Sequence, residues 1–98
     1  MKPKYLIITA DDFGLWPEIN DAVMAGYDAG IITSASLRVT GREAHSAAVS
    51  ATMRPGLGVG LHLVLCEGQA VLSHRHIPNL VDTRVIGSAV DIAASRGC

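Results

Sequence analysis

Two adjacent aspartates and a distant histidine are the residues of this sequence best suited to chemistry. Asp11 and Asp12 follow a short apolar run, and His62 lies inside another. Neighbouring carboxylates oppose each other's ionisation unless a cation or a proton relieves them. Asp12 and His62 could hold a divalent ion, with Asp11 as the general base on a water molecule that the ion activates. The three side chains therefore predict metal-assisted hydrolysis, with no substrate-binding residue assigned.

The same residues allow a simpler structural interpretation. The aspartate pair could cap the helix that follows it and close the connecting turn. A histidine among apolar residues, such as His62, is by itself more typical of a hydrogen-bonded core residue than of a metal ligand. The spacing leaves the cap and the metal site both open. It does not choose the ion either, because Asp and His ligands suit zinc, manganese, magnesium and others.

Apolar runs and helical patterns alternate along the chain. Strands are expected over residues 5–10, 31–40 and 57–65, because short apolar runs bounded by turn residues are typical of strands buried on both faces. A helix is expected over residues 17–30, which begin with proline and end with a C-capping glycine. A second helix is expected over the alanine-rich residues 42–53. This order predicts an α/β fold with a βαβαβ arrangement.

Strands that alternate with helices form parallel sheets, and such sheets carry their chemistry at the carboxyl ends of the strands. Asp11 and Asp12 come directly after the first expected strand, and His62 comes late in the third. We therefore expect all three side chains at one rim of the sheet. A phosphoacceptor receiver domain also has an acidic pair after its first strand, but it needs an aspartate after the third strand and a late lysine. His62 occupies that strand here, and no lysine follows Lys4.

The composition indicates a packed, soluble domain and excludes several classes of partner. The chain has 98 residues, of which 49% are hydrophobic and 17% charged, which predicts one small domain or part of a larger one. Its net charge of -1, without a basic patch, makes nucleic acid an unexpected partner. No apolar run approaches the ~18 residues of a transmembrane segment. Two cysteines, Cys66 and Cys98, form no disulfide framework, which favours a cytoplasmic location.

Four segments, in this order, resemble the YdjC-like (ChbG) carbohydrate deacetylase family. They are residues 9–15 (TADDFGL), 17–23 (PEINDAV), 30–37 (GIITSASL) and 59–68 (VGLHLVLCEG). The HLVL sequence within the last segment, together with PNLVD at residues 78–82, is most similar to the hopanoid-biosynthesis-associated HpnK subgroup. The resemblance extends from residue 4 to about residue 82.

The resemblance implies a metal-dependent hydrolase that removes the acetyl group from an N-acetylated amino sugar, on a (β/α) barrel-like fold. For the HpnK-like subgroup, the implied substrate is an N-acetylglucosaminyl hopanoid, which is a glycolipid. Transferred by motif, Asp11 is the general base, and Asp12 and His62 are ligands of a divalent ion, magnesium or zinc. Asn20 and Ser36 are implied supporting positions around them.

Several features depart from the family pattern. Trp16 stands where the family usually has serine, and Val64 stands where an asparagine often follows the His-Leu pair. The Trp16 ring could face substrate or cover the helix surface. The family is also expected to supply a further histidine ligand from a strand well downstream of His62, and we expect no such strand in this chain. Its remaining histidines are expected at solvated positions, namely His45, His74 and His76.

A (β/α) barrel typically needs ~250 residues, so the chain is expected to supply only part of one. Residues 1–82 are predicted to form the N-terminal part of the deacetylase domain, followed by a tail of undefined structure over residues 83–98. An incomplete parallel sheet exposes a strand edge, which favours pairing with another chain and allows a homo-oligomer. A fragment without catalysis, or an interaction module, is the alternative function.

Overall fold

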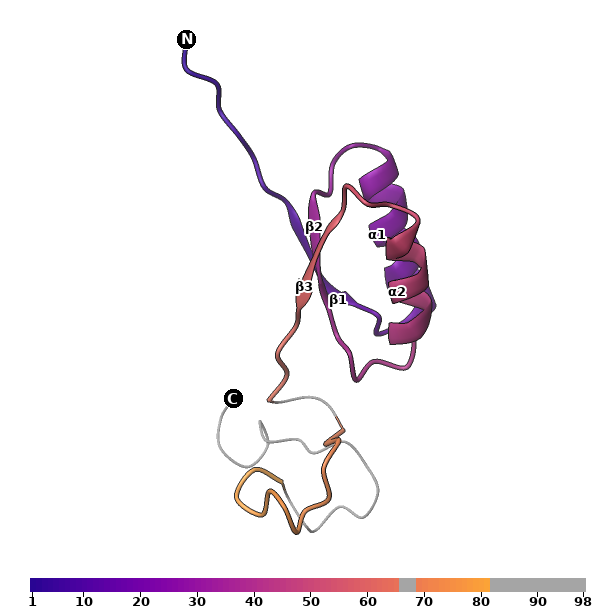
Figure 1. The fold of residues 1–98 in the computed structure, drawn as a ribbon, viewed down its shortest axis with the longest axis vertical. Helices are drawn as coiled ribbons and strands as arrows, with labels where there is room; N and C mark the ends of the chain where they lie inside the picture. Colours follow the sequence, from indigo (N-terminus) through magenta and orange to yellow (C-terminus); the bar gives the residue numbers. More distant parts are fainter. Residues whose placement is uncertain (66–68, 82–98) are drawn as a thin grey trace. The chain divides into compact units, whose positions relative to one another are not determined.

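Strands and helices alternate in the computed structural model, which describes residues 1–65 and 69–81. The elements are β1 (Thr9–Phe13), α1 (Pro17–Asp28), β2 (Ser34–Leu37), α2 (Ala44–Thr52) and β3 (Gly58–Leu61). The strands form one sheet in the order β1-β2-β3, and both neighbouring pairs are parallel. Both helices cover the same face of this sheet (Figure 1). The predicted βαβαβ arrangement is confirmed.

The helices and strands all belong to a compact unit over residues 1–62. A second unit covers residues 63–98, and its described part, residues 63–65 and 69–81, holds turns and bends without a helix or strand. The predicted boundary at residue 82, the tail beyond it and both cysteines lie outside the described residues. In the described ranges, no helix has the length and apolar character that crossing a membrane requires.

Helix α1 starts where its sequence predicts and ends at Asp28, two residues before the predicted limit, with Ala29 as its C-cap. Pro17 is its first residue, a position where a missing N–H removes no helical hydrogen bond. Gly30 follows the C-cap in a left-handed conformation with a φ of 80°. Its N–H donates to the carbonyl oxygen of Tyr27 at 2.9 Å. A left-handed glycine closes the helix without the steric penalty that a Cβ would bring.

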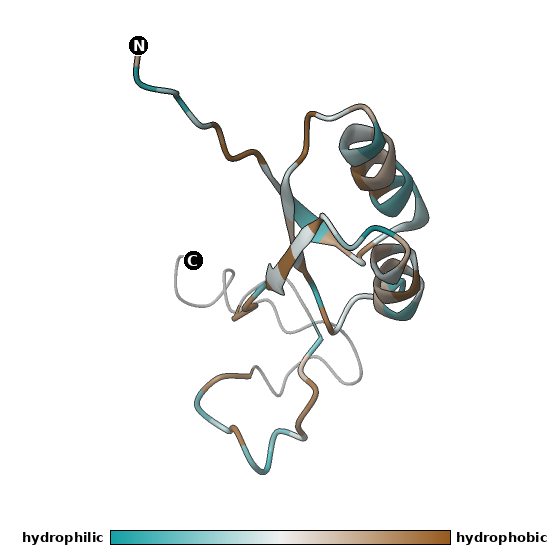
Figure 2. Ribbon diagram, turned by 45° about the horizontal axis from the view of Figure 1, so that its top comes forward, coloured by the Kyte–Doolittle hydropathy of each residue, from teal (hydrophilic) through white to brown (hydrophobic). Residues whose placement is uncertain are grey.

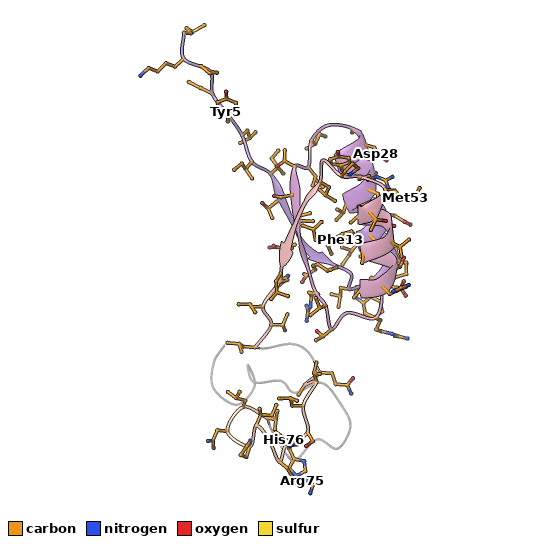
Figure 3. All side chains as sticks on the ribbon, viewed as in Figure 1. Tyr5, Phe13, Asp28, Met53, Arg75 and His76 are labelled. Carbon is orange, nitrogen blue, oxygen red and sulfur yellow. The ribbon has the colours of Figure 1, made fainter. Side chains whose placement is uncertain are left out.

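The core lies between the sheet and the two helices. Phe13 at the end of β1 is 0% exposed, and Figure 3 shows it between the sheet and the helices. Helix α1 contributes Val23 and Met24 to this core. Ile19 and Tyr27, four residues before Val23 and three after Met24, pack against it from the same side of the helix. The remaining buried apolar residues are Ala35, Ala47 and Leu57. This packing anchors the carboxyl end of β1.

β1 begins at Thr9 and contains both aspartates, so the predicted strand over residues 5–10 was placed too early. The apolar side chains of residues 5–7 are all at least 76% exposed, and Figure 2 shows this hydrophobic run extending beyond the sheet. The second strand also starts later than predicted. The N–H groups of residues 31 and 32 donate to the carbonyl oxygen of Gly26 near the end of α1. Because these two N–H groups are bonded to α1, they do not pair with residues 5–7 in the sheet.

β3 is an exposed edge strand, which contradicts the prediction of a strand buried on both faces. All of its residues are exposed, with Val59 at 42% and Leu61 at 60%. It pairs with β2 on one side, and within the described residues nothing pairs with its other edge. An apolar pattern leads to burial only where neighbouring elements cover the strand. β3 ends at Leu61, before the predicted limit at residue 65, so His62 follows the strand. Helix α2 is also shorter than the predicted 42–53.

Candidate active site

A β-bulge near the end of β1 changes the direction of the aspartate side chains. Between Ala10 and Phe13, β1 carries one residue more than the paired stretch of β2. Successive side chains of a regular strand point to opposite faces, and a bulge re-aims one of them. Asp12 is the non-glycine residue of the described ranges with a positive φ, at 59°. The bulge therefore lets the adjacent Asp11 and Asp12 carboxylates both find partners at the carboxyl end of β1.

The Asp11 carboxylate is exposed and is held by a neighbour on β2. Its Oδ1 accepts a hydrogen bond from the Ser36 hydroxyl at 3.0 Å. Ser36 alternates along β2 with the buried Ala35, so it lies on the sheet face opposite the helices. Asp11 thus presents a carboxylate to solvent from a fixed position, which is what a general base requires.

The Asp12 carboxylate is paired with a buried cation. Its Oδ1 lies 3.2 Å from Nη1 of Arg38, a residue that follows β2 directly and is 8% exposed. The positive guanidinium relieves the repulsion between neighbouring carboxylates that the sequence analysis assigned to a metal ion or a proton. Sequence reasoning missed Arg38. The available signal was a single basic residue at the carboxyl end of the second predicted strand.

The His62 ring lies beside Asp12 and Ser36, the residue that also binds Asp11. Its Nδ1 is 3.4 Å from the backbone nitrogen of Asp12, 3.6 Å from Asp12 Oδ1 and 3.3 Å from Ser36 Oγ. The backbone N–H of His62 donates to the carbonyl oxygen of Leu37 at 2.9 Å, which fixes the residue beside β2. Nδ1 accepts from the Asp12 N–H when it carries a lone pair, and donates to an oxygen when it carries a proton. The first tautomer leaves Nε2 as the protonated nitrogen.

The predicted convergence of Asp11, Asp12 and His62 at one rim is confirmed by these distances. The helix-cap interpretation of the aspartate pair is wrong. The N-cap of α1 is Trp16, and no side-chain hydrogen bond caps the helix. The two carboxylates instead bind side chains from β2 and from the residue after it.

In the described part of the chain, Asp12 and His62 are the two predicted metal ligands, and they lie close together. No group of three or more His, Cys, Asp or Glu residues that could hold an ion occurs among the described residues. Within unit 1, His45 is exposed on α2, as predicted. In unit 2, His74 and His76 are exposed, also as predicted, and His76 Nδ1 lies 3.0 Å from Ser73 Oγ. The third ligand that the family resemblance implies is therefore not found in the described part of the chain.

The other residues singled out from the sequence lie at the start of α1. The Trp16 side chain is 47% exposed, and the Arg42 guanidinium carbon lies 5.8 Å from its ring centroid. This is a cation–π contact between the loops that precede α1 and α2. Contact of Trp16 with substrate stays a prediction. Asn20 is 4% exposed and hydrogen-bonded on both sides, which agrees with a supporting position.

Comparison with known proteins identifies relatives of this chain. A family model described as YdjC-like protein matches residues 5–94, past the limit near residue 82 set by the motifs. The chain is 38% identical over 81 residues to a carbohydrate deacetylase of Thermoanaerobacter pseudethanolicus, covering 83% of this chain and 32% of that protein. It is 39% identical over 79 residues to a chitooligosaccharide deacetylase of Serratia marcescens, covering 81% of this chain and 30% of that protein.

A solved structure shares the fold. It is described as a cellobiose-phosphate cleavage protein of Enterococcus faecalis, and it matches 89% of this chain and 34% of its own with a TM-score of 0.77 and 30% identity. The chain therefore belongs to the YdjC-like family, and it is an α/β chain whose parallel βαβαβ arrangement corresponds to part of a longer relative's fold. It spans about a third of the length of the curated relatives it matches.

Proposed function

We propose that this chain carries the acid–base and metal-binding residues of a carbohydrate deacetylase, which removes the acetyl group from an N-acetylated amino sugar. The proposal rests on the convergence of Asp11, Asp12 and His62 at the carboxyl end of a parallel sheet. The relatives named carbohydrate and chitooligosaccharide deacetylases support the same substrate class.

Asp12 and His62 would hold a divalent ion. Their Oδ1 and Nδ1 atoms are 3.6 Å apart, and two ligands bound at about 2.1 Å on a tetrahedral ion lie about 3.4 Å apart. The side chains are 40% and 26% exposed, so solvent ions can reach them. A carboxylate and an imidazole suit zinc better than magnesium, which prefers oxygen ligands. A catalytic zinc site normally has three protein ligands, so this pair alone would bind an ion weakly.

The bound ion would polarise the acetyl carbonyl and make water more acidic. Asp11 would accept the proton of the attacking water as its oxygen bonds to the acetyl carbon. The amide C–N bond then breaks, the proton passes to the leaving nitrogen, and the products are acetate and a free amino sugar. Ser36 keeps the Asp11 carboxylate in place through its 3.0 Å hydrogen bond. Arg38 would keep the charge of the Asp12 carboxylate engaged through its 3.2 Å contact with Oδ1.

Within this substrate class, we favour an N-acetylglucosaminyl hopanoid. Two sequence segments support this choice, because they are most similar to the HpnK subgroup. They are LHLVLCEG over residues 61–68, which contains His62, and PNLVD over residues 78–82. Such a substrate would present its sugar to the site and keep its lipid outside. Acetate release from this glycolipid in detergent, compared with release from N-acetylglucosamine oligomers, tests the preference.

Zinc titration of the 98-residue chain by calorimetry tests the metal assignment. Asp12→Asn and His62→Ala should each abolish the weak binding, because each removes one of two donors. Asp11→Asn should leave zinc binding nearly intact, because this carboxylate is assigned to proton transfer. Acetate release should be slow in the unmodified chain and absent from Asp11→Asn, since an amide does not accept the proton.

His45→Ala is the matched control, because it removes an exposed histidine from the same unit. Its zinc affinity should equal that of the unmodified chain. Zinc binding that survives both Asp12→Asn and His62→Ala would refute the metal site. Zinc binding by the expected pair without any acetate release would favour the alternative of a chain without catalysis.

A further inference from the structure

Asn20 joins the turn after β1 to the loop before α2 from inside the protein. Its side chain lies in the first turn of α1 and is 4% exposed. Its Oδ1 accepts a hydrogen bond from the Gly14 N–H at 2.7 Å, and its Nδ2 donates to the carbonyl oxygen of Glu43 at 3.1 Å. Both ends of a buried amide are therefore bonded to backbone groups, and loss of the side chain leaves those groups to be satisfied elsewhere.

The two backbone partners of Asn20 are also bonded to each other. The Glu43 N–H donates to the carbonyl oxygen of Gly14 at 2.9 Å. Gly14 has a φ of 97°, and a Cβ there would lie 3.0 Å from Leu37 Cδ1 and 3.1 Å from Ala44 Cα. The turn after β1 is thus closed directly against the start of α2, and Asn20 completes the closure.

This closure bears on Asp12, which lies two residues before Gly14. The Asp12 carbonyl oxygen accepts from the Leu15 N–H at 3.0 Å, and the Phe13 carbonyl oxygen accepts from the Arg38 N–H at 2.8 Å. The left-handed conformation is disfavoured for residues other than glycine and persists where the surroundings hold it. The turn after β1 holds Asp12 in this left-handed conformation. Within that turn, the N–H of Gly14 donates to the side chain of Asn20.

We propose that Asn20 is a positioning residue, which holds the bulge at Asp12 and so sets the distance between the Asp12 carboxylate and the His62 ring. Without the amide, the buried Gly14 N–H loses its acceptor and the turn loses one of its two links to Glu43. Mutation of residues that support metal ligands typically lowers metal affinity by roughly 10–100-fold. The effect on zinc rests on the proposed function, whereas the effect on the turn does not.

Amide hydrogen exchange of the unmodified chain and of Asn20→Ala tests the positioning role without a metal. The readout is the exchange rate of the Gly14 amide divided by that of the Thr33 amide. Thr33 lies at the amino end of β2, and its N–H donates to the carbonyl oxygen of Ile8. Asn20→Ala should raise this ratio about tenfold or more, because local opening of the turn becomes easier while the far end is unaffected. Its zinc dissociation constant should rise about tenfold or more.

Val23→Ala is the control for lost stability, since Val23 lies one turn further along α1 and is 3% exposed. It should speed exchange at both amides and leave their ratio unchanged. If Asn20→Ala does not fold, Asn20→Asp keeps the acceptor for Gly14, loses the donor to Glu43, and should raise the ratio less. An unchanged ratio in the Asn20 variants, or an equal rise in Val23→Ala, overturns the positioning role. Absence of zinc binding in the unmodified chain overturns the metal function alone, and the exchange ratio still decides the role of Asn20.

Discussion

Gly41 lies in the loop before α2, against the turn after β1, and it has no room for a side chain. A Cβ on Gly41 would overlap the carbonyl oxygen of Gly14, and it would lie 2.7 Å from the carbonyl carbon of Gly14 and 3.0 Å from the carbonyl oxygen of Arg38. These atoms belong to the backbone, so no side-chain rotation relieves the overlap. Gly41→Ala must therefore push the two loops apart.

The cost of this change follows from ordinary overpacking. Extra atoms in a closely packed site cost about 1–3 kcal/mol. For a domain of this size, each kcal/mol lowers the melting temperature by about 4–8 °C, so Gly41→Ala should melt roughly 4–24 °C below the unmodified chain. Thermal unfolding followed by far-ultraviolet circular dichroism measures the difference.

Gly60→Ala is the matched control, because no heavy atom lies within 4 Å of a Cβ built on Gly60. Its melting temperature should stay close to that of the unmodified chain or rise slightly, since alanine restricts the unfolded chain more than glycine does. Equal melting temperatures for Gly41→Ala and Gly60→Ala would refute the reasoning, because they would mean that the two loops are not in backbone contact.

Two further changes test the core and the helix pair. Phe13→Ala should cost about 3–5 kcal/mol, because it empties a fully buried site, and should largely unfold the chain; circular dichroism at 25 °C checks this, and a folded variant would contradict the position of Phe13 in the core. The Arg54 guanidinium, which donates to both carboxylate oxygens of Asp28 at 2.9 and 2.8 Å, holds the pKa of Asp28 below its ordinary value. This ion pair stabilises the fold above the ordinary pKa of aspartate and is lost as pH falls through the lowered one, so urea midpoints should be lower for Asp28→Asn at neutral pH and should converge with those of the unmodified chain in acid. A difference that does not change with pH would contradict the pair.

The alternation of elements, the start of α1 and the glycine that closes this helix could be read from local sequence. Pro17 and Gly30 each act through their own backbone, since a fixed φ starts the helix and a left-handed φ ends it. The common rim of Asp11 and His62 followed from the parallel arrangement, because parallel strands bring their carboxyl ends together. These features depend on single residues or on the order of the elements, both of which the sequence contains.

The bulge at Asp12 and the partner Arg38 could not be read in the same way. The bulge is a mismatch of register between β1 and β2, and register depends on how two distant segments pack. Strand burial failed as a prediction for a related reason. The apolar pattern of β3 states what the strand can bury, whereas its exposure depends on which elements cover it.

The partners of the two carboxylates give a physical reason for the different roles that we propose for them. Asp12 faces a guanidinium and an imidazole, so its charge is engaged by cationic or metal-ligating groups from two other segments. Asp11 faces a neutral hydroxyl on the exposed side of the sheet. A carboxylate beside an imidazole is suited to share a cation with it, and an exposed carboxylate beside a hydroxyl is suited to accept a proton from water. The bulge creates this difference, because in a regular strand the two neighbours would point to opposite faces and only one of them could reach the rim.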